Sequence, residues 1–235
     1  MSNKNIDSTK EEKKWQDKKP LYYDPKLDIN KVQDYMDHIF YSLYTDPKYT
    51  YAKYVGMGIR KDMDLNCDTA YVGYDRVKNE IFLGFSPYFM NHFIEKQRRG
   101  VIGHEYLHVI FEHLTYRSTN NPRERMLLNI AQDLAINSII STDPGCLPEL
   151  CFCPGEPLKQ AKEGDKAPDP AFSKFIEKLP KMQDSEFYFE QLLEFFKDKQ
   201  SPEEIVIVIG GNGTMDDHSV WDEIPEHLKD AINEK

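Results

Sequence analysis

The segment from Gly103 to His113, G-H-E-Y-L-H-V-I-F-E-H, constrains the fold of this chain more than any other. Residues four apart lie on one face of an α-helix, so a helix here directs His104 and His108 toward one point, with Glu105 beside it. Two imidazoles at this spacing with an adjacent glutamate are typical of a zinc-dependent peptidase, in which the glutamate is the general base. A helix that carries these histidines by chance is the alternative.

A catalytic zinc site normally has three protein ligands and a water. His113 follows His108 by five residues and would point about 140° away from the ligand face of a continuous helix. Glu112 lies on the correct stripe, but it is two turns from His104, which is too far for both to share one ion. Neither residue is therefore the expected third ligand. His113 is expected either to be exposed to solvent or to contact a ligand side chain without binding the metal itself.

Three polar residues recur at four-residue spacing in the apolar segment N-I-A-Q-D-L-A-I-N, namely Asn129, Asp133 and Asn137. Buried polar groups cost free energy unless they are paired or bind a metal. A short loop would make this helix an antiparallel neighbour of the motif helix, so Asp133 is the expected third ligand, with Asn129 and Asn137 orienting the ligands. A hydrogen-bonded ladder without metal is the alternative. The donor set favours zinc but also suits iron, manganese or nickel.

Hydrophobic periodicity and turn signals predict an α+β chain. Two strands are expected to form a hairpin, and the second of them, Glu80–Phe85, is expected to offer an edge that an extended peptide could join. Ser86 is expected to cap a helix that begins at Pro87. The other expected elements are helices from Ile29, over Arg123–Ile140 and over 184–197, and strands over Thr69–Tyr74 and Glu203–Ile209.

A chain of 235 residues favours one domain. Residues 1–25 are polar and lysine-rich and are expected to form an N-terminal arm, and residues 26–235 are expected to form the domain. Within it, residues 144–182 carry seven prolines and three of the four cysteines, which predicts a long loop. The C-terminal segment 203–235 is acidic, with nine Asp or Glu residues against two lysines.

The cysteines do not form the paired C-x-x-C knuckles of a structural zinc site. Cys67 stands alone, while Cys146, Cys151 and Cys153 lie within eight residues of one another. An intracellular chain keeps such thiols reduced. Buried free thiols are therefore expected in preference to a second metal site.

The overall charge and the ends of the chain exclude several classes of protein. Thirty basic and forty acidic residues give a formal net charge of −10, which disfavours nucleic-acid binding. No apolar run approaches the ~20 residues of a membrane span, and the N-terminus has no apolar core of a signal peptide. A cytoplasmic protein without membrane or nucleic-acid partners is expected.

Five segments occur in an order that resembles a known family: T-A-Y-V-G-Y, E-I-F-L-G-F-S-P-Y-F, the motif segment, N-I-A-Q-D-L-A-I-N and D-D-H-S-V-W. They resemble a metallopeptidase domain that, in many bacterial and phage proteins, precedes a von Willebrand factor A-like domain. The resemblance covers roughly residues 30–225. The resemblance takes up most of the 235 residues, so the second domain is not expected in this sequence.

The resemblance implies a zincin-like α+β fold, in which a small sheet packs on the motif helix and on a second metal-ligand helix. It implies zinc at His104 and His108, an acidic ligand at Asp133 and a general base at Glu105. It also implies that His218 and Trp221 lie near the site. His218 is expected to stabilise the oxyanion of the reaction, although a solvated His218 that caps a helix is an equal alternative.

These inferences predict a zinc peptidase that hydrolyses peptide bonds with metal-activated water, and hence a protein or peptide substrate. The alternative is a catalytically silent, phage-encoded interaction protein that the metal stabilises. Such a protein would bind a partner protein through the N-terminal arm or the acidic C-terminal segment.

Overall fold

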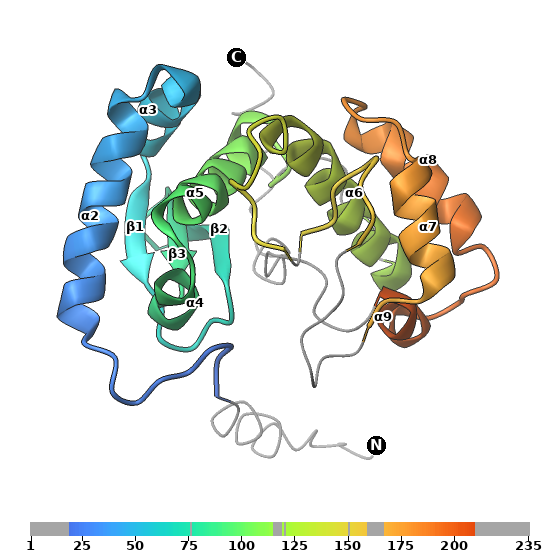
Figure 1. Ribbon diagram of the computed structural model, residues 1–235, viewed down its shortest axis with the longest axis horizontal. Helices are drawn as coiled ribbons and strands as arrows, with labels where there is room; N and C mark the ends of the chain where they lie inside the picture. The colour runs from blue at the N-terminus through green and yellow to red at the C-terminus, as the bar shows by residue number, and fades with distance from the viewer. Residues whose placement is uncertain are drawn as a thin grey trace, which may run out of the picture.

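Figure 1 shows the computed structural model of the chain, which is an α+β fold with a small sheet among helices. The structure describes residues 19–75, 77–114, 119, 121–149, 151–158 and 167–209. In chain order the elements are α2 (Ile29–Thr45), the 3-10 helix η1 (Pro47–Tyr49), α3 (Thr50–Gly56), β1 (Arg60–Met63), β2 (Ala70–Asp75), β3 (Glu80–Phe85), α4 (Pro87–His92), α5 (Glu95–Ile110), α6 (Pro122–Ile140), α7 (Pro170–Lys178), α8 (Ser185–Phe195) and α9 (Pro202–Ile209).

The sheet has three strands in the order β1-β3-β2. The expected hairpin is confirmed, because β2 and β3 pair antiparallel with Val72 opposite Leu83. The expectation that β3 offers an edge is wrong, since β1 pairs with its other side in parallel. The segment R-K-D-M of β1 lacks the alternation of a half-buried strand, so the pattern gave no sign of it. The edge positions among the described strands belong to β1 and β2.

The expected start of a helix at Pro87 is confirmed, and this helix, α4, ends at His92. The Ser86 hydroxyl accepts a hydrogen bond from the Phe89 amide, as an N-cap does. The backbone then becomes extended at Phe93 and Ile94, which separates α4 from α5. The motif helix is therefore a new element and does not continue the one that follows the sheet.

The strand expected at Glu203–Ile209 is wrong, because this segment is helix α9. Its β-branched residues favour a strand by propensity. A local capping box outweighs that preference: the Glu204 amide donates to the Ser201 hydroxyl, and the Ser201 amide donates to the Glu204 carboxylate. Ile205 and Ile209, four residues apart, then lie on one face and are buried.

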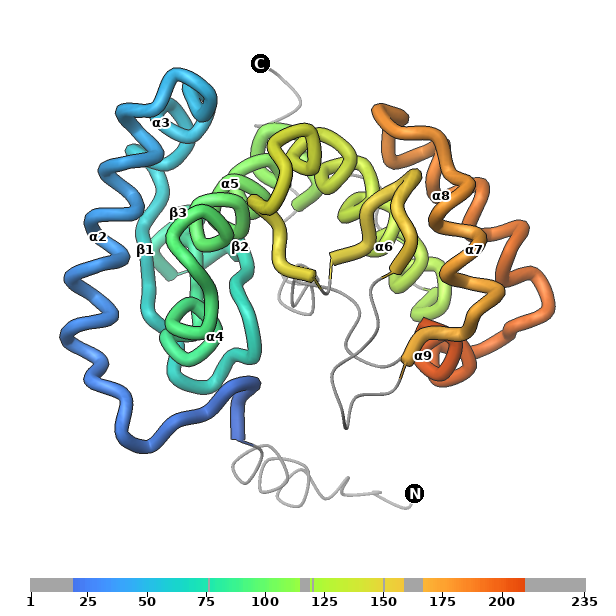
Figure 2. Tube along the Cα trace, in the orientation of Figure 1, coloured from blue at the N-terminus to red at the C-terminus, as the bar shows by residue number. Residues whose placement is uncertain are grey.

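Two clusters of buried apolar side chains form the core, and α6 belongs to both. The first cluster joins α2, α3, the sheet, α4 and α5, and it includes Ile136 and Ile140 of α6. The second joins α7, α8 and α9 to the part of α6 that runs from Leu127 to Ala135. Figure 2 shows the chain trace with the sheet on one side and α7–α9 on the other, and α6 between them. Asp133 lies in the part of α6 where one cluster gives way to the other.

Close packing fixes the position of α5. A Cβ atom on Gly100 would lie 1.9 Å from the carbonyl oxygen of Cys146, so only glycine allows this approach of helix and loop. A Cβ atom on Gly103 would lie 2.9 Å from the hydroxyl of Tyr51. The motif helix therefore touches the backbone that follows α6 directly, without intervening side chains.

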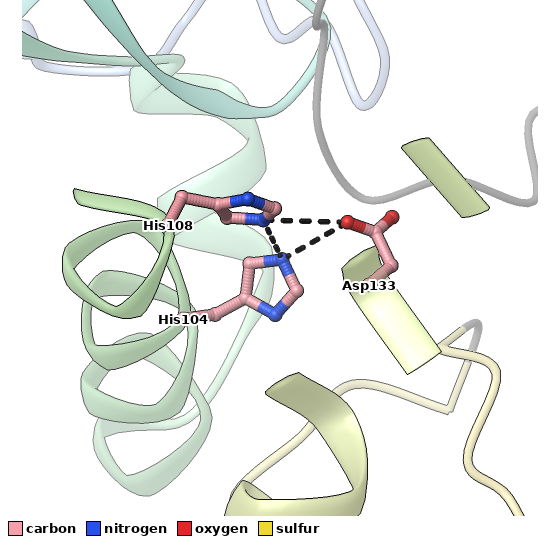
Figure 3. A group of neighbouring side chains, drawn as sticks. All are labelled: His104, His108 and Asp133. Atoms are coloured by element: carbon pink, nitrogen blue, oxygen red, sulfur yellow. Dashed lines mark hydrogen bonds and ion pairs between the residues drawn. The ribbon is translucent and has the colours of Figure 1, made fainter. Parts of the chain in front are cut away.

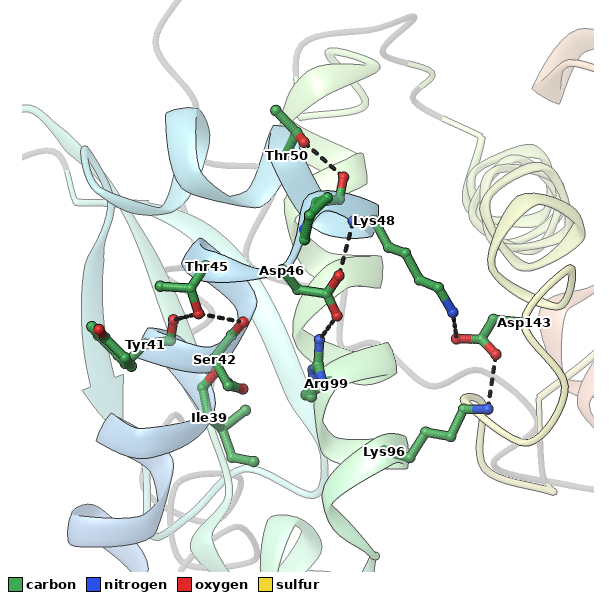
Figure 4. A network of polar contacts seen from close by, with 11 residues as sticks. Ile39, Tyr41, Ser42, Thr45, Asp46, Lys48, Thr50, Lys96, Arg99 and Asp143 are labelled. Atoms are coloured by element: carbon green, nitrogen blue, oxygen red, sulfur yellow. Dashed lines mark hydrogen bonds and ion pairs between the residues drawn. The ribbon is translucent and has the colours of Figure 1, made fainter.

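Charged groups tie the first turns of α5 to the ends of α2 and α6, as Figure 4 shows. Asp46, after α2, accepts from the Lys48 amide and from Arg99, and these contacts hold the pKa of its carboxyl below the usual value. Asp143, after α6, pairs with Lys96 at 2.8 Å and Lys48 at 3.5 Å, and the bond to Lys96 is the main reason that its pKa is lowered. Both carboxylates stay ionised. Their ion pairs therefore join the start of α5 to the C-terminal ends of α2 and α6.

Several expectations concern segments outside the described residues. They are His218, Trp221, residues 1–18 of the arm and the acidic segment beyond Ile209. The long loop expected over 144–182 contains α7.

Candidate metal centre

Two helices bring three donor side chains to one buried point (Figure 3). His104 and His108 come from α5 and Asp133 from α6, and all three are at most 4% exposed. The two Nε2 atoms are 2.9 Å apart, and Oδ1 of Asp133 lies 3.5 Å from Nε2 of His104 and 3.3 Å from Nε2 of His108. One donor atom from each of the three residues lies within 4.8 Å of the others.

These distances fit a single metal ion. Zinc binds imidazole nitrogen at ~2.0–2.1 Å in tetrahedral geometry, which places two donors about 3.3 Å apart. The three measured separations, 2.9, 3.3 and 3.5 Å, lie around that value. Two imidazoles and a carboxylate are also costly to bury together unless something binds them. The donor set is therefore one that can hold a divalent transition metal.

The charge of Asp133 favours the protonated form of His104. Burial alone would lower the pKa of His104, but the hydrogen bond and charge of Asp133, with the nearby Glu105 carboxylate, outweigh it and raise the pKa. Without a metal, this group of side chains thus favours an extra positive charge. A metal cation satisfies the same demand.

Asn137 fixes the orientation of the His104 ring. Its Nδ2 donates to the carbonyl oxygen of Phe152 at 3.1 Å, which leaves Oδ1 as the acceptor at 2.9 Å from Nδ1 of His104. Nδ1 of His104 must then carry the proton in the neutral ring, so the lone pair lies on Nε2, facing Asp133 and His108. Asn137 therefore lies where the sequence predicted a ligand-orienting residue.

Comparison with protein families decides where the chain belongs. A family model described as "Putative metallopeptidase domain" matches residues 63–224, a range that contains all three donor residues. The chain belongs to this metallopeptidase-domain family. No curated protein and no solved structure matches it.

In this member of the metallopeptidase-domain family, His113 contacts His108 at Nδ1, the ring nitrogen that does not face Asp133. Nδ1 of His113 is 3.0 Å from Nδ1 of His108, and the side chain is buried. The 140° offset assumed a continuous helix, but α5 ends at Ile110 and Glu112 takes a positive φ of 57°. The turn bonds the His113 amide to the His108 carbonyl at 2.9 Å and returns the imidazole to its neighbour. Because Glu112 is neither Gly nor Asn, no residue type marks this turn in the sequence.

Glu105 and Asn129 complete the predicted set. Glu105 is fully buried on α5 next to His104, and its charge acts on the His104 pKa. Asn129 is only half-buried on α6, and among the described residues no hydrogen bond joins it to the donor side chains. Glu112 is exposed. The structure thus brings Glu105 and Asn137 to the donors, whereas Asn129 stays outside their hydrogen bonds.

The cysteines do not belong to this donor group. Cys67, Cys146, Cys151 and Cys153 are buried thiols that form no disulfide. Across the described part of the chain, His104, His108 and Asp133 form the one group of three or more such side chains that could hold a metal. No helix in that same part is long and apolar enough to cross a membrane.

Loss of the Asn137 amide should weaken metal binding. We expect Asn137→Leu to reduce zinc affinity roughly 10–100-fold, the usual effect of removing a group that orients a ligand. Competition with a chromophoric chelator measures the affinity. Asn91→Leu, at an exposed position on α4, is the matched control and should bind zinc as the wild type does. Unchanged affinity in a folded Asn137→Leu protein would show that the ring needs no such support.

Proposed function

We propose that this chain is a zinc-dependent peptidase that hydrolyses peptide bonds, with His104, His108 and Asp133 as the metal ligands. The observation that supports it most is the convergence of three buried donors within 4.8 Å in a chain of the metallopeptidase-domain family. The family points to protein or peptide substrates. The helix pair with its small mixed sheet supports a zincin-like fold as part of the same proposal.

A bound divalent metal would lower the pKa of water toward ~7 and polarise the scissile carbonyl. The protein supplies the proton transfer. Glu105 takes a proton from the attacking water as its oxygen bonds to the carbonyl carbon, and then gives that proton to the amide nitrogen as the C–N bond breaks. Burial of Glu105 beside His104 keeps the carboxylate close to the point where the donors meet.

Asn137 and His113, which are not ligands in this proposal, orient the two imidazoles that are. Asn137 holds His104 with its lone pair toward the shared point. If His108 binds metal through Nε2, its Nδ1 carries the proton and donates to Nδ1 of His113. Each imidazole ligand is therefore oriented by a neighbour that is not itself a ligand.

Metal removal tests the proposal. Purified protein should hold about one zinc per chain. A chelator should remove the zinc, lower the melting temperature and abolish cleavage of a proteome-derived peptide mixture, and added zinc should restore all three. Cleavage products are identified by mass spectrometry. A protein that binds zinc tightly and cleaves nothing would instead be a metal-stabilised interaction protein.

A further inference from the structure

A cavity of about 430 Å³ lies between the end of α5, one face of α6 and the segment that leads into α8. Its volume falls in the roughly 300–1,000 Å³ range of ligand pockets. Ala135 and Ile139 form the α6 wall, and they follow Asp133 by about 200° and 240° around the helix. The cavity is therefore separate from the point where the donor side chains meet. The described lining residues are Phe111, His113, Ala135, Ile139, Met182, Gln183, Asp184, Ser185 and Glu186.

A continuous row of rings joins the donor group to this cavity. The ring centroids of His104 and His108 are 4.7 Å apart, and those of His108 and His113 are 5.0 Å apart. The His113 ring lies 5.6 Å from the ring of Phe111, and both residues line the cavity. One imidazole thus separates the cavity from a proposed metal ligand. An occupant that packs against His113 and Phe111 therefore acts on the support of His108.

The turn between Phe111 and His113 has a strained backbone. Glu112 has a φ of 57°, in the left-handed region that glutamate rarely adopts. Such a conformation costs free energy and persists only where surrounding contacts hold it. A molecule that packs against Phe111 and His113 together adds contacts on both sides of Glu112. Occupancy of the cavity therefore stabilises the turn that keeps His113 against His108.

Hydrogen bonds hold the opposite wall of the cavity in place. The Met182 amide donates to the hydroxyl of Ser138, a fully buried residue of α6, at 3.3 Å. The Gln183 amide donates to the Tyr188 hydroxyl at 3.4 Å, and this hydroxyl donates to the carbonyl oxygen of Pro180 at 2.7 Å. These bonds fix the wall within the fold itself, which lowers the entropic cost of binding.

The lining favours an uncharged aromatic occupant. Phe111 and His113 present rings and Met182 presents a thioether, and each of these groups packs well against an aromatic ring. Phe111 is 38% exposed and Met182 is 61% exposed, so both have apolar surface that an occupant can cover. No lysine or arginine belongs to the described lining, whereas the carboxylates of Asp184 and Glu186 do, which disfavours an anion.

We propose that this cavity binds a small uncharged aromatic molecule, and that its occupancy strengthens zinc binding through His113 and His108. The inference rests on the metal ligands of the proposed function and does not depend on catalysis. Coupling between two binding sites is reciprocal, so zinc strengthens the binding of the aromatic molecule by the same factor.

Binding of toluene to the full chain tests the proposal, because toluene has no nitrogen, oxygen or sulfur to bind zinc. Saturation-transfer NMR should show toluene bound to wild type, and methylcyclohexane should give much weaker signals. Saturating toluene should lower the zinc Kd about fivefold or more, the lower end of typical coupling between sites. Competition with a chromophoric chelator measures this Kd. The absence of a toluene signal, or a zinc Kd that toluene does not change, would overturn the proposal.

Met182→Ala tests the wall of the cavity. It removes an exposed thioether and should weaken toluene binding roughly 2–10-fold, the usual worth of a sulfur–aromatic contact. Zinc affinity without toluene should not change. Met57→Ala, at an exposed position directly after α3, is the matched control and should bind toluene as wild type does. Equal toluene binding by the two variants would show that the probe does not occupy this cavity, against the proposal.

Glu112→Asn tests the turn that couples the two sites. Asparagine adopts the left-handed conformation more readily than glutamate, so the turn needs less support from an occupant. Zinc should bind more tightly than to wild type without toluene, and the further gain from toluene should shrink. A gain as large as that of wild type would overturn coupling through this turn.

None of these measurements uses cleavage, so they separate this inference from the peptidase function. A chain that cleaves peptides but binds no toluene refutes the cavity proposal alone. A chain that shows coupled binding of zinc and toluene, yet cleaves no peptide, refutes the peptidase function alone. A chain that binds no zinc refutes both.

Discussion

Glu105→Gln should lower kcat by roughly 10²–10⁴-fold, the contribution of a positioned general base, while zinc remains bound. Glutamine has nearly the same shape as glutamate but cannot take a proton from water. Glu105 is not one of the three proposed donors, so the metal content should stay near one per chain. Steady-state cleavage of a peptide found with wild type gives kcat, and metal analysis of the same sample gives the zinc content.

A matched substitution on the same helix separates the loss of the base from a general effect of lost charge. Glu95 lies in the exposed first turn of α5, so Glu95→Gln removes one negative charge from the motif helix far from the donors. This variant should keep wild-type activity. If Glu105→Gln cleaves as fast as Glu95→Gln, Glu105 is not the base. If Glu105→Gln loses the metal, its activity carries no information on proton transfer, and Glu105 must be assigned to metal binding.

His108→Ala should abolish both zinc binding and the stabilisation that zinc provides. At a free zinc concentration of 100 times Kd, binding stabilises the folded state by about 2.7 kcal/mol. For a chain of this size that corresponds to roughly 5–10 °C in melting temperature. The variant should show no such rise when zinc is added, because two donors remain where three are needed. Thermal unfolding with and without zinc measures the difference.

The matched control is His38→Ala, which removes an exposed imidazole from α2. It should keep both the bound zinc and the zinc-dependent rise in melting temperature. His108→Ala should also be less stable than wild type without zinc, since the substitution leaves a cavity and takes away the neighbour of His113. A zinc-dependent rise that persists in His108→Ala would show that other residues bind the ion, and it would remove His108 from the ligand set.

The three donors were predictable because each left a trace in the sequence. Helical spacing placed His104 and His108 together, and the polar position of Asp133 in an apolar segment indicated either a metal ligand or a hydrogen-bonded ladder. The same buried stripe marked Asn137, which bonds to His104, but also Asn129, which does not. Spacing alone cannot separate them, because the outcome depends on where the neighbouring helix crosses α6.

What the sequence could not predict depended on contacts between distant segments or on local turns. The polar strand β1 exists because β3 offers it a partner, and that pairing moved β3 from the edge to the centre of the sheet. A capping box at Ser201 converted a strand-like run into α9. The position of His113 followed from the left-handed turn at Glu112, a conformation that its residue type does not favour.

Membership of α6 in both core clusters has a consequence for the folding reaction. Neither cluster is complete until α6 is in place, since the first needs Ile136 and Ile140 and the second needs the stretch from Leu127 to Ala135. Asp133 therefore reaches its partners on α5 only when α6 packs against α5. The donor set is thus complete only in the packed fold, and a chain in which α6 has not docked on α5 offers an incoming ion two histidines without their carboxylate.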